Sequence, residues 1–524
     1  MPIALPDAPP KSSVNRDIRK ESSRECIGLR EYGFLAVLIS AAVCSAGLLV
    51  WQTISPQAVV FGGIIVDRLS TLLTLLVAAV GAVTFRFSLV YLAGEPGQVR
   101  FLRWLFWTIS AAYLLMLSTN LWLLFCAWLV VSIGLHQLLL FYQDRPAALR
   151  PARKKFLISR LGDGALLWAI CLIGGHWKTW DLREFLAVSA HDTGGTVTLV
   201  GLLVVIAALT KSAQFPFHSW LPETMEAPTP VSALMHAGII NAGGALVLRF
   251  APLISRTPPA LLLLALIGTT TMVLGMLAMW AQPNVKRTLA WSTVSQMGFM
   301  MAECGIGAFS AAVLHIIGHG FYKAWSFLRT GDVPSRAATP AAPLSPAFAL
   351  LLSALGTVVS LLFVMGTTRL TGFQPLHSPG ELALSVVLAL SAGQFWVACV
   401  RTAPQARRRN TLAGAAFGGL VISFTACTLY AWANTFFAPV FGVLPTEAGP
   451  VAWISASLPA IALAALCALH PLLPALMQTK RGRAFYVYAL HGFYVGAHAD
   501  QIVDRFFSKT TPQRANYERR TDYA

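Results

Sequence analysis

An apolar helix that stops at a lysine decides how this chain must fold: residues 201–217 read GLLVVIAALTKSAQFPF. Nine apolar or small residues lead to Thr210 and Lys211, and Pro216 follows five positions after the lysine. Proline removes a backbone donor and breaks a helix, and a charge at bilayer depth costs roughly 2.5–3.5 kcal/mol on insertion scales. We therefore expect a broken membrane helix in which Lys211 gains and loses a proton. The alternative is a lysine that snorkels to the membrane surface.

The composition of the whole chain agrees with a membrane protein. Of its 524 residues, 56% are hydrophobic and 12% are charged, against ~25% charged residues in soluble domains. An ordinary soluble enzyme, a disordered chain and a fibrous protein are thereby excluded. The eight cysteines form no CxxC pair and mostly lie in apolar runs. We expect them to be buried apolar residues, with no disulfide framework, iron–sulfur cluster or zinc site in this chain.

The fold class predicted from the apolar segments is an all-α polytopic membrane protein with about 14 transmembrane helices. A bilayer core requires ~20 apolar residues per helix, and long strand-like alternation is absent. The candidate spans are 30–52, 61–92, 101–119, 121–143, 155–175, 196–217, 229–252, 260–280, 287–305, 309–330, 346–367, 381–401, 411–437 and 451–476.

The distribution of lysines and arginines predicts the orientation of the chain in the membrane. With the N-terminus inside, 31 of them fall on inner segments and 6 on outer ones, and Lys211 and Lys323 lie within spans. Cytoplasmic loops carry such an excess, so both termini are predicted to be cytoplasmic. The formal charge of +17 then reflects topology and anionic lipid, not nucleic acid. Residues 1–29 lack a signal peptide pattern and are expected to form a flexible basic cytoplasmic tail.

An internal repeat is indicated by two similar breaks. The stretch from Thr368 to Pro375 places Arg369 beside an apolar span and a proline shortly after it, as 210–216 does with Lys211. Each break is the fourth of five consecutive spans, and two sets of five have opposite topology, as in transporters built from inverted repeats. The predicted parts are 1–29, N-terminal helices 30–100, a first repeat 101–252, a second repeat 260–401, C-terminal helices 411–476 and a cytoplasmic amphipathic tail 477–524.

A stripe of titratable residues follows in the span 309–330. His315, His319 and Lys323 are spaced four apart and therefore share one face of a helix. Imidazole accepts and donates protons near neutral pH, so the stripe is interpreted as a hydrated proton wire. Two core histidines with an interfacial lysine are the alternative. A metal site is disfavoured because no HExxH motif or carboxylate accompanies the stripe.

Other ionisable residues surround the first break. His236 follows a Pro-Thr-Pro helix start and, taken alone, would more often be structural. Glu223 and Glu226 are either ordinary loop acids or the partners of Lys211 and His218.

For two further basic residues, Lys286 and Arg160, the sequence leaves open whether their role is structural or functional. Lys286 follows Asn284 at an inner loop, where it is either a topology signal or drawn inward by its helix. Arg160 and Asp163 are three apart, which suits an ion pair on one helix face.

These segments together resemble the antiporter-like subunits of respiratory complex I and of Mrp antiporters. The resemblance is carried by 211–236, 284–298, 315–324 and 156–163, and it covers about residues 60–330. It implies two inverted five-helix bundles, each with a broken helix, and a proton path across the membrane. The predicted path runs through Lys211, Glu223, His236, Lys286, His315, His319 and Lys323, supported by His136, Arg160, Asp163, His218 and Arg369.

One departure from the complex I pattern concerns the acid of the family's lysine–glutamate pair. In complex I a membrane glutamate follows the tryptophan that matches Trp128, whereas this chain has Leu129. His136 lies seven residues on, on the same helix face, and is expected to replace the acid in part. The region 331–524 also lacks the long lateral helix of the complex I subunit.

A narrower resemblance is to the DabB-type subunits of inorganic carbon transporters, carried by 132–146 and 486–494. It implies a bacterial inner membrane location, an ion gradient of protons or sodium, and a large cytoplasmic DabA-like partner resembling a β-carbonic anhydrase with zinc. The aromatic tail 484–507 is expected to dock that partner or to lie on lipid as an amphipathic helix. No flavin, haem, quinone or nucleotide motif is present, so no cofactor is expected in this chain and any catalysis is assigned to the partner. A complex I-type pump subunit and a Mrp-type antiporter subunit remain the alternatives.

Overall fold

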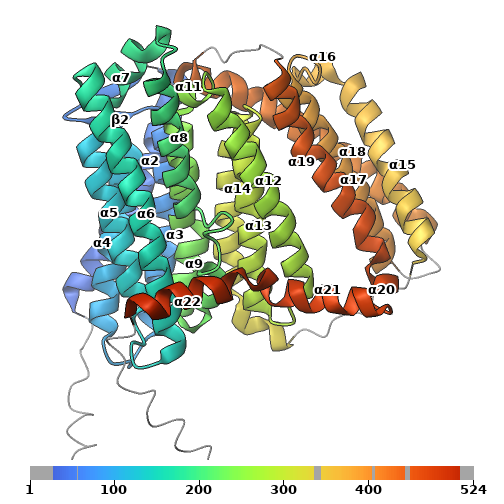
Figure 1. Cartoon of the computed structure of the whole chain (residues 1–524), viewed down its shortest axis with the longest axis horizontal. Coiled ribbons are helices and arrows are strands. Elements are labelled where there is room, and N and C mark those ends of the chain that lie inside the picture. The colour runs from blue at the N-terminus through green and yellow to red at the C-terminus, as the bar shows by residue number, and fades with distance from the viewer. Residues whose placement is uncertain (1–27, 56, 336–343, 404–407, 443–448, 508–524) are drawn as a thin grey trace, which may run out of the picture.

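The molecule is a slab of long helices that run side by side, as the computed structural model in Figure 1 shows. The structure describes residues 28–55, 57–335, 344–403, 408–442 and 449–507. Nearly all the regular structure within these ranges is helical, which agrees with the predicted all-α class. Of the predicted tail 1–29, residues 1–27 lie outside the described residues. Of the predicted tail 477–524, residues 508–524 lie outside them.

The long helices follow the predicted apolar segments in order. In the first half they are α2 (Leu29–Ile54), α3 (Arg68–Tyr91), α4 (Gln98–Leu117), α5 (Leu121–Leu139), α6 (Pro146–Trp177) and α8 (Gly195–Lys211). In the second half they are α12 (Pro258–Ala281), α13 (Val285–Gly305), α14 (Phe309–Leu328), α15 (Pro346–Gly366), α17 (Pro379–Thr402), α18 (Arg408–Phe441) and α19 (Pro450–Leu469).

Ten helices in the described ranges are long and apolar enough to cross a membrane. The predicted spans outside that set are α4, α8, α13 and α14; α8 has only 17 residues. All four lie alongside the other long helices (Figure 1). The count of 14 therefore stays a prediction.

A short hairpin precedes α3, so the predicted span 61–92 begins too early. Strands β1 (Val59–Phe61) and β2 (Ile64–Val66) pair antiparallel around Gly62 and Gly63, whose φ angles are 57° and 81°. Glycine adopts such positive φ values without steric cost. Asp67 then caps the helix by accepting a hydrogen bond from the Ser70 backbone, which fixes the start of α3 at Arg68.

The predicted break in 196–217 is present and begins at Lys211, the last residue of α8. Ala213 has a φ of 49°, and the chain then passes through the short 3-10 helix η2 (Leu221–Glu226). We call residues 212–228 the connector. The helix after it is interrupted as well, which the sequence did not indicate. It consists of α9 (Thr229–Ala237), η3 (Ile239–Asn241), α10 (Ala242–Arg249) and α11 (Ala251–Ile254).

A glycine lets the two interrupted helices approach closely. A Cβ on Gly243 of α10 would lie 2.4 Å from the backbone oxygen of Ala208 in α8. Ser212 also donates a hydrogen bond to the Ile240 carbonyl at 2.7 Å, which supplies a partner inside the break.

The prediction that the span 346–367 is interrupted like 196–217 is wrong. α15 is an uninterrupted helix, and the short α16 (Thr368–Thr371) follows at its far end (Figure 1). Arg369 is exposed there. The cation of this predicted break thus lies at the end of a span, whereas Lys211 is buried within the bundle.

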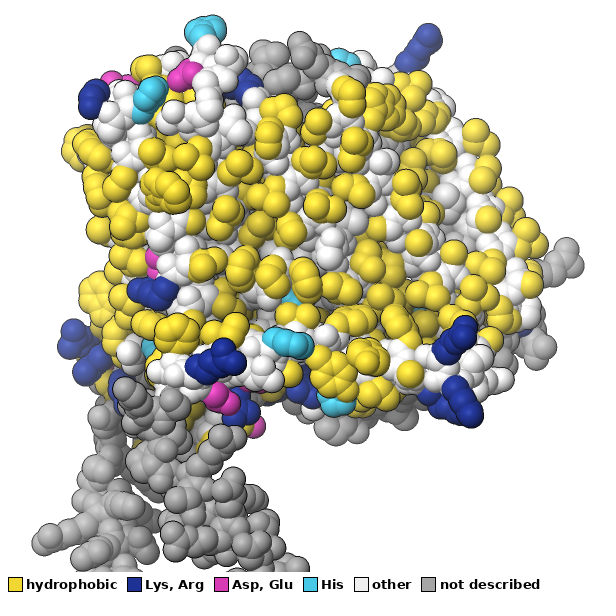
Figure 2. Space-filling view, viewed as in Figure 1, with side chains coloured by type: hydrophobic (Ala, Val, Ile, Leu, Met, Phe, Trp, Pro, Cys, Tyr) yellow, Lys and Arg dark blue, Asp and Glu magenta, His cyan; other side chains and the backbone are white. Residues whose placement is uncertain are grey.

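The described part of the tail crosses one end of the bundle, nearly at right angles to the long helices (Figure 1). It consists of α21 (Lys480–Leu490), the 3-10 turn η7 (Gly492–Tyr494) and α22 (Val495–Phe507), which we call the C-terminal strap. Tyr486 Oη donates to the Ala281 carbonyl and Gln282 Nε2 donates to the Leu490 carbonyl, both at 3.1 Å. Figure 2 shows lysines and arginines along this end, below a broad hydrophobic belt.

Candidate functional site

Lys211 points into the protein at the end of α8. Its Nζ donates to Ser132 Oγ at 2.8 Å and to the Trp128 carbonyl at 3.2 Å, both on α5. The ammonium also lies 4.2 Å from the centre of the Trp128 ring, which is a cation–π contact. The side chain is buried, so the snorkelling alternative is wrong and Lys211 has protein partners at the break.

The expected ion pair between Arg160 and Asp163 is present on α6, with 2.6 Å between Arg160 Nη2 and Asp163 Oδ2. Trp128 Nε1 donates to Asp163 Oδ1 at 2.8 Å. The indole therefore stands between this carboxylate and Lys211, touching both. Asp163 acts on Lys211 through space and through Trp128, not by a direct hydrogen bond.

Leu129, which stands where complex I has its glutamate, is half-buried beside this site. His136, the expected substitute, lies one helical turn beyond Ser132 and packs against Phe156, with 5.3 Å between ring centres. The hydrogen bonds of Lys211 go to Trp128 and Ser132.

A second buried lysine stands next to Lys211, and sequence reasoning missed it. Lys155 is only 4% exposed, and its Nζ donates to the Ser132 carbonyl at 2.7 Å. A cavity of about 10 Å³ is lined by both lysines together with Ser159 and Trp220. A cavity must have a volume of about 10–15 Å³ to hold one water. The space between the lysines is therefore close to the size of one water.

The acids of the connector have partners other than the two weighed from the sequence. Glu223 pairs with Lys154 at 2.7 Å, and Glu226 pairs with Arg145 at 3.2 Å. Lys154 also meets Asp500 of the C-terminal strap at 2.8 Å. Burial raises the pKa of Glu223, against the opposing effect of the Lys154 ammonium.

His218 is buried in the connector between two aromatic rings. Its ring centre lies 5.7 Å from that of Phe215 and 5.5 Å from that of Trp291. A Cβ on Gly492 of the strap would meet the same Trp291 ring at 2.6 Å. The strap therefore packs against Trp291 of α13 and Lys154 of α6, which are the residues that contact His218 and Glu223 of the connector.

A second group of titratable residues lies on α9 and α14. His236 and His319 are buried, and neither has a hydrogen-bond partner for its ring nitrogens among the described residues. His236 stacks on Phe327 with 4.3 Å between ring centres. Lys323 is fully buried and donates to the Leu289 carbonyl at 3.0 Å.

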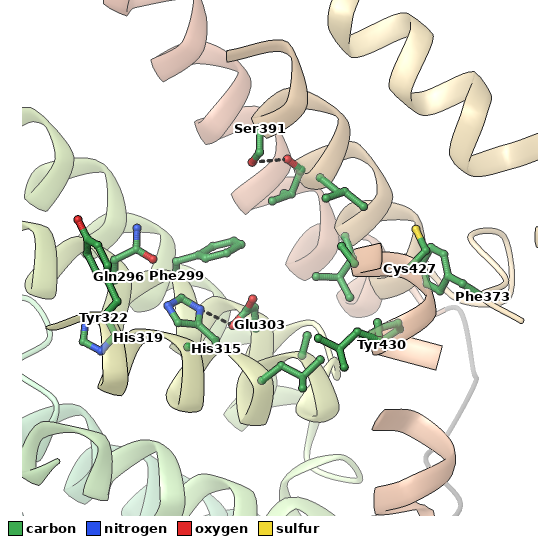
Figure 3. A pocket seen from close by; sticks show the side chains of 18 of the residues that line it. Gln296, Phe299, Glu303, His315, His319, Tyr322, Phe373, Ser391, Cys427 and Tyr430 are labelled. Atoms are coloured by element: carbon green, nitrogen blue, oxygen red, sulfur yellow. Dashed lines mark hydrogen bonds and ion pairs between the residues drawn. The ribbon is translucent and has the colours of Figure 1, made fainter. Parts of the chain in front are cut away.

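The stripe predicted on α14 faces a cavity of about 660 Å³, shown in Figure 3. His315, His319 and Lys323 line it from α14, while α17 and α18 contribute Leu388, Ser391 and Tyr430 on the opposite wall. The common face expected from the four-residue spacing is therefore observed. The cavity is large enough for many water molecules beside the stripe.

Glu303 of α13 lies beside this stripe, so the expectation that no carboxylate accompanies it is wrong. Its Oε2 lies 2.9 Å from His315 Nδ1, the interaction dashed in Figure 3. The signal was present, since Glu303 is an acid inside the apolar segment 287–305, and buried acids at membrane depth are generally functional.

The remaining predicted residues lie at the edges of these groups. Lys286 is the second residue of α13, is half-buried, and donates to Thr229 Oγ1 at the start of α9, at 3.1 Å. Arg369 is exposed and joins neither group. Within the described ranges, no three His, Cys, Asp or Glu side chains come close enough to hold a metal ion.

Comparison with known proteins gives a family match over residues 118–404, to the family described as NADH:quinone oxidoreductase/Mrp antiporter, TM. The probable inorganic carbon transporter subunit DabB2 of Halothiobacillus neapolitanus is 35% identical over 446 residues, covering 84% of this chain and 80% of that one. The probable subunit DabB of Hydrogenovibrio crunogenus is 40% identical over 270 residues, covering 51% of this chain and 52% of that one.

Among solved structures, a chain of the Mrp complex from Dietzia sp. matches with a TM-score of 0.52 and 24% identity. The match covers 93% of this chain and 57% of the Mrp chain. At this identity the likeness concerns the fold alone, a polytopic helical membrane subunit.

Proposed function

Because the chain belongs to the NADH:quinone oxidoreductase/Mrp antiporter transmembrane family, we propose that it is the proton-conducting membrane subunit of a complex that accumulates inorganic carbon. As a member of that family it is an ion-translocating membrane subunit. The substrate, the partner and the energy coupling are our proposal.

The observation that carries the proposal is the position of Lys211, inside the bundle at the break of α8. An amine either holds or releases a proton, and a serine hydroxyl both donates and accepts hydrogen bonds. Ser132 Oγ at 2.8 Å therefore suits the charged and the neutral lysine alike. A fixed structural cation would instead be expected beside a carboxylate, because a buried charge needs an opposite one.

The second half of the proposed path is the stripe on α14. His319 has two ring nitrogens without protein partners among the described residues, and it faces the 660 Å³ cavity. Water in that cavity would bridge His315, His319 and Lys323, and Glu303 beside His315 would accept or return a proton. We propose that His236 and Lys286 continue the path toward the connector and the inner face, where His218 and Glu223 lie.

The proposed partner is a large cytoplasmic DabA-like subunit that resembles a β-carbonic anhydrase and binds zinc. Two relatives are named as DabB subunits of inorganic carbon transporters. The C-terminal strap supports a docked partner at the end that we assign to the cytoplasm, since it exposes Tyr488, Ile502 and Phe506, the last 72% exposed. Exposed aromatic groups of this kind are typical of protein interfaces.

In this proposal the membrane subunit itself performs no catalysis. Hydration of carbon dioxide yields bicarbonate and a proton, and proton flow through the membrane subunit would make that step directional. The complex would lie in a bacterial inner membrane with both termini in the cytoplasm, and the coupling ion would be H⁺ or Na⁺.

A second candidate is an ion-pumping subunit of a complex I-like or Mrp-type assembly. The family match and the Mrp fold support it. The absence of a carboxylate at Leu129 beside Lys211 argues against a complex I type of lysine–glutamate pair.

Purification of the native complex through a tag on this chain tests the proposal. We expect a large co-purifying subunit with stoichiometric zinc, and growth at low carbon dioxide that depends on both subunits. Quinone-oxidoreductase subunits or small Mrp subunits in place of a zinc protein would contradict the inorganic carbon role.

A further inference from the structure

Lys155 is a buried cation, and no carboxylate of the described residues is hydrogen-bonded to it. It lies on α6 where that helix passes α5, and its hydrogen bond goes to the backbone carbonyl of Ser132. A buried charge is costly in a membrane and is usually retained for function. The path described above uses Lys211 but leaves Lys155 without a role.

We propose that Lys155 is a second proton-exchanging residue of the site, passing protons between Lys211 and the inner end of the bundle. This inference rests on the proposed function and extends it to a residue outside the predicted path.

Ser132 connects the two lysines directly. Its hydroxyl accepts from Lys211 at 2.8 Å and its carbonyl accepts from Lys155 at 2.7 Å. Both lysine residues also line the same 10 Å³ cavity, which is close to the size of one water. A water there would accept a proton from Lys155 as it gives one to a neutral Lys211. Lys155 then becomes the neutral amine and Lys211 the ammonium, so that protons and charge balance.

The charges around the pair favour one proton shared between two lysines. Lys211, Asp163 and Arg160 are the charged groups that act on Lys155, and Lys155 in turn acts on His136 of α5. Asp163 is already paired with Arg160 at 2.6 Å. Within the part of the chain that the structure describes, the site therefore offers no unpaired carboxylate to a second ammonium. Charging one lysine then disfavours charging the other.

The inner end of this route lies beside the connector. Lys154 precedes Lys155 and, being about 100° away around the helix, faces Glu223 and Asp500 instead of Ser132. Both acids are partly exposed, Glu223 in the connector and Asp500 on the C-terminal strap itself. Protons would thus reach Lys155 from a cluster of carboxylates at the inner end.

The test compares Lys155→Gln with Lys155→His in the complete complex, reconstituted in vesicles with an internal pH dye. Both replacements donate hydrogen bonds and are similar in size, but only histidine exchanges a proton. The matched control is Arg150→Gln, which removes an exposed cation near the start of the same helix.

We expect proton flux to fall of the order of 100-fold in Lys155→Gln, the scale of a positioned proton-transfer group. Lys155→His should keep measurable flux with its pH profile displaced to lower pH, because histidine titrates several units below lysine. Arg150→Gln should match the wild type.

Wild-type flux in Lys155→Gln, or loss of assembly in both variants, would overturn the inference in favour of a structural lysine. Lys211→Gln separates this inference from the proposed function. If it loses flux while Lys155→Gln does not, only the role of Lys155 fails. If both keep flux, the proposed function fails with it.

Discussion

Asp500→Asn should loosen the C-terminal strap without disturbing the membrane helices. Asp500 pairs with Lys154 at 2.8 Å, and Lys154 is only 1% exposed while the Asp500 side chain is 26% exposed. Exposed pairs contribute about 0.2–1 kcal/mol, and removing one partner of a fully buried pair costs about 3–5 kcal/mol. Glu223 still neutralises Lys154 in the variant. We therefore expect the docking of α22 to lose about 1 kcal/mol of free energy, close to the range for exposed pairs. This loss corresponds to a roughly fivefold rise in the detached population of α22.

Hydrogen exchange of the peptide 495–507 in nanodiscs measures this population. Asp504→Asn is the matched control, because it removes the same charge from an exposed position of the same helix. Exchange should rise about fivefold in Asp500→Asn and stay near the wild type in Asp504→Asn. Equal exchange in the two variants would refute the reasoning that the Lys154–Asp500 ion pair holds the strap against α6.

Three further outcomes are expected. His319→Ala should abolish ion transport while the protein remains inserted and assembled, because its ring nitrogens face the cavity without other partners among the described residues; loss of assembly in a size-exclusion profile would favour the structural alternative. Truncation at Ala484 should leave an inserted protein that no longer co-purifies with its partner, since most of the C-terminal strap is removed; retention of the partner at wild-type stoichiometry would leave only a lipid role for the strap. Gly243→Ala should destabilise the protein by about 1–3 kcal/mol, measured as a lower Tm, because its Cβ would meet the Ala208 carbonyl at 2.4 Å; the control Gly164→Ala, which has open space around it, should change little.

The broken helix and the α14 stripe were accessible from sequence because each depends on local spacing. A proline after Lys211 interrupts α8, and a four-residue period places His315, His319 and Lys323 on one face whatever surrounds them. The Arg160–Asp163 pair follows from the same kind of spacing. These predictions required no knowledge of how the helices pack.

The residues that were missed depend on packing between helices. Lys155 belongs to a basic run with Arg150, Arg153 and Lys154, which favoured a topology signal. Its burial arises because α6 continues through this run and turns Lys155 toward Ser132, while Arg150 stays exposed.

The tail shows the same limit. Its aromatic composition indicated a surface helix but not which surface it covers. The contacts at Ala281, Gln282 and Lys154 join residues more than 200 positions apart along the chain. Whether Arg369 is buried or exposed likewise depends on where α15 ends. The spacing between a cation and a proline in the sequence does not determine that end.

The central claim is that Lys211 moves protons and does not merely supply a positive charge. Proton flux through the reconstituted complex should be measured for Lys211→Ala, Lys211→Arg and the exposed control Arg183→Ala, with assembly checked for each. Arginine keeps the charge but does not release its proton in proteins. We predict that Lys211→Ala and Lys211→Arg both assemble and both lose flux, while Arg183→Ala conducts like the wild type. Wild-type flux in Lys211→Arg would contradict the claim, because a permanent charge would then suffice at the break.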